Sequence, residues 1–248
     1  MKRIVLALAI LMIVVSATPL KAAAAPSNLQ INLNGQGGSQ SLSIPVQIVI
    51  YLTVLTFIPA LLISLTSFTR IVIVFHFLRQ ALGTNETPSN QIVIGLTLFL
   101  TFFVMAPVGE KIHHDAVQPL MDGSISQGEA FTRAIVPMRG FMFRYTRQKD
   151  LALFESIAKE PAPNKQDDIP TTVLIPAFMI SELKTAFQIG FVIFLPFLII
   201  DMVVATVLLS MGMLQLPPVM VSMPFKILLF IMVDGWNLIV GSLVKSFY

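Results

Sequence analysis

Few residues of this 248-residue chain have the types and spacing that chemistry requires. The best candidate for a metal site is His113-His114-Asp115, but adjacent histidines point about 100° apart on a helix and chelate poorly on their own. His76, between two phenylalanines, is more typical of an interface than of a ligand set. The chain has no cysteine, no Gly-x-x-x-x-Gly-Lys loop and no Gly-x-Ser-x-Gly turn. We therefore expect no enzymatic activity, no metal and no cofactor.

Charged residues inside apolar stretches are a sharper signal. Asp201 and Lys226 lie the same distance along the chain from the middle of a predicted turn, and Glu182 and Lys245 share that midpoint. Residues equidistant from the turn of an antiparallel helix pair lie at the same height, so we predict two acid–base pairs. Such charges either form structural ion pairs or line a proton or ion pathway, and both interpretations stay open.

Methionines gather at the same turn. Met211, Met213, Met220 and Met223 lie close together in the sequence, on either side of Pro217-Pro218. Methionine is long, unbranched and flexible, so a ring of such side chains can close around an opening of variable shape. Ordinary apolar packing is the alternative interpretation.

The composition shows what kind of elements hold these residues. Hydrophobic residues make up 55% of the chain and charged residues only 12%, whereas soluble domains carry about 25% charged residues. The 16 basic and 13 acidic residues include no Lys/Arg run, so a nucleic-acid surface is not indicated. The sequence predicts a protein of a membrane or of a membrane complex.

The amino-terminal end is typical of a secretory signal peptide. Met1-Lys2-Arg3 precedes an apolar run from Ile4 to Val15 and an alanine-rich stretch at 22–25. The apolar run is shorter than the roughly 20 residues that span a bilayer, which argues against the alternative of a first membrane anchor. We predict a signal peptide at 1–25 and a flexible leader at 26–43, rich in Asn, Gln, Gly and Ser.

The rest of the chain contains four long apolar segments, at 44–68, 91–108, 186–209 and 224–244. We predict an all-α protein with two long kinked helical hairpins of membrane type, at 44–109 and 185–248. Residues 69–90, with Arg70 and Arg79, are predicted to connect the two apolar segments of the first hairpin. The region 110–184 between them holds most of the charges and is predicted to be a small helical insertion outside the cytoplasm, with helices at 128–135 and 141–157. The prolines and charges in the apolar segments favour helices that bury part of their surface against protein.

Two stretches identify a family. Pro176 to Phe191 (PAFMISELKTAFQIGF) and Pro224 to Trp236 (PFKILLFIMVDGW) closely resemble signatures of the FliP family. Its members are flagellar export-apparatus proteins related to a core component of virulence type III secretion. Shorter stretches at 66–71, 81–84 and 100–103 are also similar. The resemblance extends from about residue 42 to the end of the chain.

The resemblance implies a subunit of the export gate in the bacterial inner membrane, at the flagellar basal body. Several copies, five in the family's assemblies, join FliQ and FliR around a channel for unfolded flagellar proteins. Other export-apparatus membrane proteins and lipid are further partners, and much of the mass lies on the periplasmic side. The family's methionine-rich constriction corresponds to Met211, Gly212 and Met213. The alternative function is an ion-translocating channel or a secondary transporter built from two hairpins.

Overall fold

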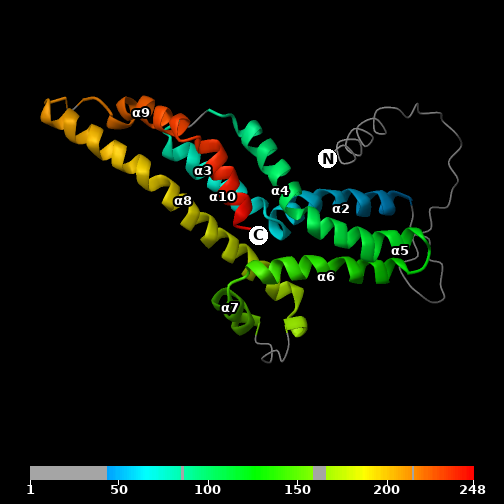
Figure 1. Cartoon of the computed structure of the whole chain (residues 1–248). Helices are drawn as coiled ribbons and strands as arrows, with labels where there is room; N and C mark the ends of the chain where they lie inside the picture. Colours follow the sequence, from blue (N-terminus) through cyan, green and yellow to red (C-terminus); the bar gives the residue numbers. More distant parts are fainter. Residues whose placement is uncertain (1–43, 85–86, 159–165, 214) are drawn as a thin grey trace, which may run out of the picture. The chain divides into compact units, whose positions relative to one another are not determined.

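The computed structural model describes residues 44–84, 87–158, 166–213 and 215–248, and every regular element in these ranges is helical (Figure 1). The elements are α2 (Ile44–Leu65), α3 (Phe68–Ala81), α4 (Asn90–Ile112), the π-helical turn η1 (His113–Val117), α5 (Gln118–Met121), α6 (Gln127–Tyr145), α7 (Gln148–Ala158), the short turn η2 (Gln166–Asp168), α8 (Thr171–Ser210), α9 (Pro218–Met232) and α10 (Gly235–Lys245). The predicted all-α class is confirmed for this part of the chain. The predicted signal peptide and leader lie outside the described residues.

Several helices have membrane length. Ile48–Leu65, Asn90–Met121 and Thr171–Ser210 are each long and apolar enough to cross a membrane, and α9 with α10 makes a fourth if the two count as one. A bend of 66° separates α9 from α10. Asp234 takes a left-handed conformation at this bend (φ 51°), and a Cβ on Gly235 would lie 2.2 Å from the ring of Phe230. The bend therefore depends on a residue without a side chain at position 235.

The core of residues 57–248 is built around α3, which packs along α8 (Figure 1). The buried apolar face of α3 follows the helical period, and it consists of Ile71, Val74, Phe75, Leu78 and Ala81. Gly190 of α8 lies against Phe77, and a Cβ at this position would come within 2.5 Å of the ring. A glycine here lets the two helices approach closely.

Residues 69–90 are not simply the predicted connection between two apolar segments, because 69–81 belong to the buried helix α3. Arg70 and Arg79 suggested a polar connection, but the Arg70 side chain lies inside the fold next to Glu182. Helices α3 and α4 pack against each other. Helices α8 and α9 also pack against each other.

The polar region differs from the prediction in two places. The helix predicted at 141–157 is broken, because Thr146 is extended (ψ 127°) and the Arg147 N–H donates to Ser181 Oγ at 3.0 Å. The predicted boundary at 184/185 lies inside α8, which runs without interruption from Thr171 to Ser210. Helix α8 therefore belongs both to the polar region and to the apolar one.

Candidate functional site

The most deeply buried charged cluster joins α3 to α8. The side chains of Arg70 and Glu182 are 3% and 0% exposed. Arg70 Nε donates to Glu182 Oε2 at 2.8 Å, and Arg70 Nη2 donates to Glu182 Oε1. Arg70 Nη1 donates to the Ser246 carbonyl at 3.1 Å and to its Oγ at 3.0 Å. The planar guanidinium thus binds a carboxylate in the bidentate geometry that suits it and also holds the end of the chain after α10.

Aromatic rings complete this cluster. The guanidinium carbon of Arg70 lies 3.9 Å from the centre of the Phe247 ring and 5.3 Å from that of Tyr145. The Tyr145 hydroxyl donates to the Phe247 carbonyl at 2.5 Å. Cation–π contacts of this kind strengthen when the cation is desolvated. The cluster therefore connects α6 as well as α3, α8 and the carboxyl-terminal residues.

The predicted pair of Glu182 and Lys245 is replaced by the pair of Glu182 and Arg70. The prediction assumed that the return helix runs straight back along α8. The bend between α9 and α10 changes its direction before it reaches the level of Glu182, and α3 supplies the nearer cation. Lys245 lies on the exposed surface.

The structure brings Asp201 and Lys226 together. Lys226 Nζ donates to Asp201 Oδ2 at 2.6 Å and to the Ala81 carbonyl at 3.0 Å. Ser222 Oγ donates to Asp201 Oδ1 at 2.5 Å. The Lys226 side chain is 2% exposed and that of Asp201 is 20% exposed. This network ties α8 and α9 to the end of α3, and it satisfies a lysine that would otherwise be buried without a partner.

Residues 211–213, the methionine loop, follow the last turn of α8. Gly212 has φ +74°, its N–H donates to the Leu209 carbonyl, and the Met213 N–H donates to the Leu208 carbonyl. These bonds form a Schellman motif, which ends a helix with a glycine in the left-handed region. Met211 and Met213 are 67% and 39% exposed. The loop therefore presents two flexible apolar side chains outside the core.

A third network attaches α7 to α8. The buried Asp150 carboxylate accepts a hydrogen bond from Ser181 Oγ at 2.9 Å and forms an ion pair with Lys184. Burial by itself raises the pKa of Asp150, but the hydrogen bonds from Lys184 and Ser181 and the charges of Lys184 and Arg147 lower it. The net pKa of this carboxyl lies below its ordinary value.

We expect the packing of α7 on α8 to weaken only in strong acid. The pKa of Asp150 is lower in the folded protein than the value of about 3.9 in an unfolded chain. The stability that the ionised Asp150 carboxylate gives to this packing is therefore fully present above about pH 4. It is lost as the pH falls through the pKa of the folded protein. Asp150→Asn removes this contribution, so the α7 amides should exchange faster with deuterium at pH 7. Glu155→Gln, in the same helix, is the matched control. Unchanged α7 exchange in Asp150→Asn would contradict the role of this carboxylate.

The metal candidates do not form a ligand cluster in the described residues. His114 Nδ1 lies 2.8 Å from Asp115 Oδ1, and both side chains are more than half exposed. No group of three or more His, Cys, Asp or Glu side chains suited to a metal ion occurs in the part of the chain that the structure describes. His76 is exposed on α3.

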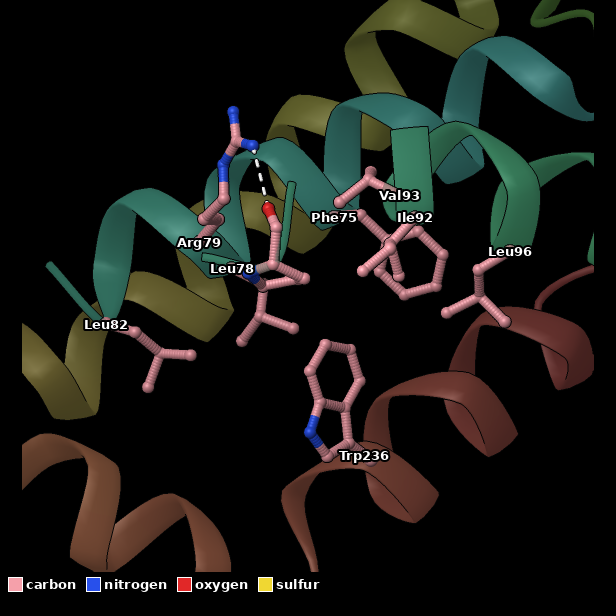
Figure 2. Close-up of a pocket in the computed structure, with 9 residues that line it drawn as sticks. Phe75, Leu78, Arg79, Leu82, Ile92, Val93, Leu96 and Trp236 are labelled. Carbon is pink, nitrogen blue, oxygen red and sulfur yellow. Dashed lines mark hydrogen bonds between the residues drawn. The ribbon is translucent and has the colours of Figure 1, made fainter. Parts of the chain in front are cut away.

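A small apolar pocket of about 190 Å³ lies between α3, α4 and Trp236 of α10. Figure 2 shows Trp236 facing Leu78 across this space, while the guanidinium of Arg79 points away from it. Arg79 Nη1 donates to the Pro88 carbonyl at 3.2 Å and to Asn90 Oδ1 at 2.6 Å, so it ties the end of α3 to the start of α4. The pocket offers apolar surface rather than groups for a reaction.

These features define an all-helical membrane protein whose apolar helices are joined by internal ion pairs. Residues 51–243 match the model of the FliP family. The chain is 60% identical over 205 residues to the flagellar biosynthetic protein FliP of Bacillus subtilis, a match that covers 83% of this chain and 93% of that protein. It is 54% identical to the protein of the same name from Pectobacterium carotovorum, with 83% and 80% covered, and 49% identical to that of Aquifex aeolicus, with 82% and 85% covered. The chain therefore belongs to the FliP family.

Sequence reasoning missed Arg70 as a partner of Glu182 and Ser222 as a partner of Asp201. One signal could have found Arg70. The apolar residues at 71, 74, 75 and 78 repeat with the helical period, which predicts a buried helix face directly after this arginine. A cation at the start of such a face requires an anion in the core.

Proposed function

We propose that this protein is a core subunit of the flagellar protein export gate, where it forms the wall and the constriction of a channel for unfolded flagellar proteins. Membership of the FliP family supports the flagellar role. In this proposal the signal peptide at 1–25 is removed and the leader at 26–43 follows it. Residues 44–109 and 185–248 act as two helical hairpins, and 110–184 lies on the periplasmic side of the bacterial inner membrane.

The exposed apolar surface supports an assembly of many chains. In the most apolar 18 residues of α8, only 11% is buried within the chain. For the helix Asn90–Met121 the corresponding share is 17%. Lipid can cover such surfaces, but the charges and prolines of α8 and α9 favour protein neighbours. We propose that further copies, five in all, together with FliQ and FliR family proteins provide this cover, and that other export-apparatus membrane proteins bind the complex.

The observation that carries the channel proposal is the exposed methionine loop at the end of α8. Met211 and Met213 stand outside the core on either side of a glycine whose conformation ends the helix. Brought together from several copies, such side chains form a flexible apolar ring. The ring excludes hydrated ions when the channel is idle and deforms around a passing polypeptide. The work requires no catalysis and no cofactor.

The alternative is an ion channel or secondary transporter. It would use the charges inside the apolar helices as a pathway. Glu182 is bound by two nitrogens of Arg70, and Asp201 by Lys226 and the Ser222 hydroxyl, and this favours a structural role for both carboxylates.

We expect Met211→Ala/Met213→Ala to raise the leak of small ions through the assembled complex. Alanine removes bulk from the constriction, whereas the fold keeps its core because both side chains lie outside it. The measurement is membrane conductance divided by the amount of assembled complex. Met121→Ala in α5, where the side chain is 79% exposed, is the matched control and should not raise the leak.

Under the packing interpretation, the same double change would cost stability, about 2–5 kcal/mol for each well-buried methionine. It would then lower the amount of complex without changing the conductance of each one. If the conductance per complex equalled that of the Met121→Ala control, the proposed role of Met211 and Met213 in sealing the channel would be wrong.

A further inference from the structure

Two cavities lie on either side of one row of residues on α6, formed by Val136, Gly140 and Arg144. These residues are four apart, so they share one face of the helix, and all three line both cavities. The larger cavity, of about 620 Å³, extends to Lys111 of α4, and the smaller one, of about 440 Å³, extends to Arg139. The row is therefore a ridge with space on both flanks.

The larger cavity has an excess of positive charge. Lys111 and Arg144 line it from two different helices, and the five ion pairs among the described residues include neither of them. The carboxylate in its lining, that of Asp115, lies instead 2.8 Å from His114 Nδ1. Cations that lack an anion in their own chain are suited to a ligand that brings carboxylates, because these form charge-assisted hydrogen bonds with both.

The ridge also allows close approach of another backbone. A Cβ on Gly140 would meet no atom within 4 Å, so the surface of α6 is open at this point. Val136, one turn earlier, is 64% exposed and offers an apolar contact. A small inorganic anion would use the two cations and leave Val136 and Gly140 without a contact. A protein segment that crosses α6 at Gly140 would use the cations, the open surface and the apolar side chain together.

We propose that this ridge is the docking site for an acidic segment of a different protein in the assembly, whose carboxylates bind Lys111 and Arg144. A second copy of this chain is poorly suited to the role. Its only two adjacent acidic residues are Asp167 and Asp168, and Asp168 already takes part in an interaction within the chain. The inference rests on the proposed function in one respect, namely that the chain works in an assembly with other proteins.

The test is photo-crosslinking from the ridge in the assembled complex. Benzoylphenylalanine replaces Val136 in the full chain, the complex is illuminated and purified, and the crosslinked peptide is identified by mass spectrometry. We expect a peptide of a different protein, with two Asp or Glu residues within about two helical turns of the crosslinked position. Lys111→Gln/Arg144→Gln should lower the crosslinked fraction by about tenfold or more, because two charge-assisted contacts are lost.

Matched variants separate docking from general effects of charge and folding. Arg133→Gln/Lys149→Gln removes two cations that line neither cavity and should leave the crosslink unchanged. Gly140→Leu fills the open surface of the ridge and should lower the crosslinked fraction. Gly128→Leu, in the first turn of the same helix, should not. A Cβ at either glycine meets no atom within 4 Å, so both variants are compatible with the fold.

Three results would each overturn the proposal: a crosslinked peptide without acidic residues, a peptide from a second copy of this chain, or an unchanged crosslink in Lys111→Gln/Arg144→Gln. If the purified complex contained other proteins but none of them was captured at position 136, the docking site would be wrong and the proposed assembly would stand. If the chain purified without any other protein, the proposed assembly would be wrong as well.

Discussion

Glu182→Ala is expected to destabilise the fold by about 3–5 kcal/mol, because it leaves the cation of Arg70 buried without its carboxylate. Both side chains of this pair are almost fully buried, and Arg70 is also held between the carboxyl-terminal segment and two aromatic rings. The loss of stability should affect all four segments that meet at Arg70, namely α3, α6, α8 and the residues after α10. The measurement is denaturant unfolding in detergent, followed by helical circular dichroism, together with the amount of assembled complex.

Two controls show whether the effect comes from the buried charge. Glu129→Ala breaks the exposed pair of Glu129 and Arg133 in α6 and should cost less than about 1 kcal/mol. Arg70→Met/Glu182→Leu removes both buried charges and should recover much of the stability lost in Glu182→Ala. If Glu182→Ala and Glu129→Ala unfolded at the same denaturant concentration, the pair would not be a main support of the core.

Asp201→Ala is expected to reduce assembly, because the buried Lys226 then keeps, among the described residues, only the Ala81 carbonyl as a partner. Breaking a fully buried pair costs about 3–5 kcal/mol, and the partial exposure of Asp201 places the expected loss at or below the lower end of this range. Asp201→Asn/Lys226→Gln removes both charges while keeping similar shapes, so it should recover part of the assembly. Ser222→Ala removes one hydroxyl donor, which lies within reach of Asp201 Oδ1 and the Val219 carbonyl, and should cost about 1 kcal/mol.

The same double variant distinguishes the two functions. A structural pair predicts that Asp201→Asn/Lys226→Gln assembles and still supports protein export. An ion pathway through these residues predicts that it assembles but loses transport, because neutral side chains cannot exchange a proton at this point. Assembly of Asp201→Ala at the level of the unchanged protein would contradict the pairing itself.

The amino-acid sequence by itself determined the class of this protein. The hydrophobic content and the long segments without charge require helices of membrane length, because a helix satisfies its own backbone hydrogen bonds in an apolar environment. The stretches at 176–191 and 224–236 were specific enough to indicate the family. The pairing of Asp201 with Lys226 also followed from spacing, because a short turn between two antiparallel helices sets which residues lie at the same height.

The tertiary structure decided the rest, because it depends on contacts between residues far apart in the chain. The partner of Glu182 is 112 residues away, in a helix where the long apolar segments predict only a connection. No local pattern shows that α3 lies along α8, since this requires the missing side chain of Gly190 to face Phe77. The bend at Asp234 likewise moved Lys245 away from its predicted partner. Spacing predicts contacts only as far as a helix pair stays straight, and beyond a bend the packing of other helices decides which charges meet.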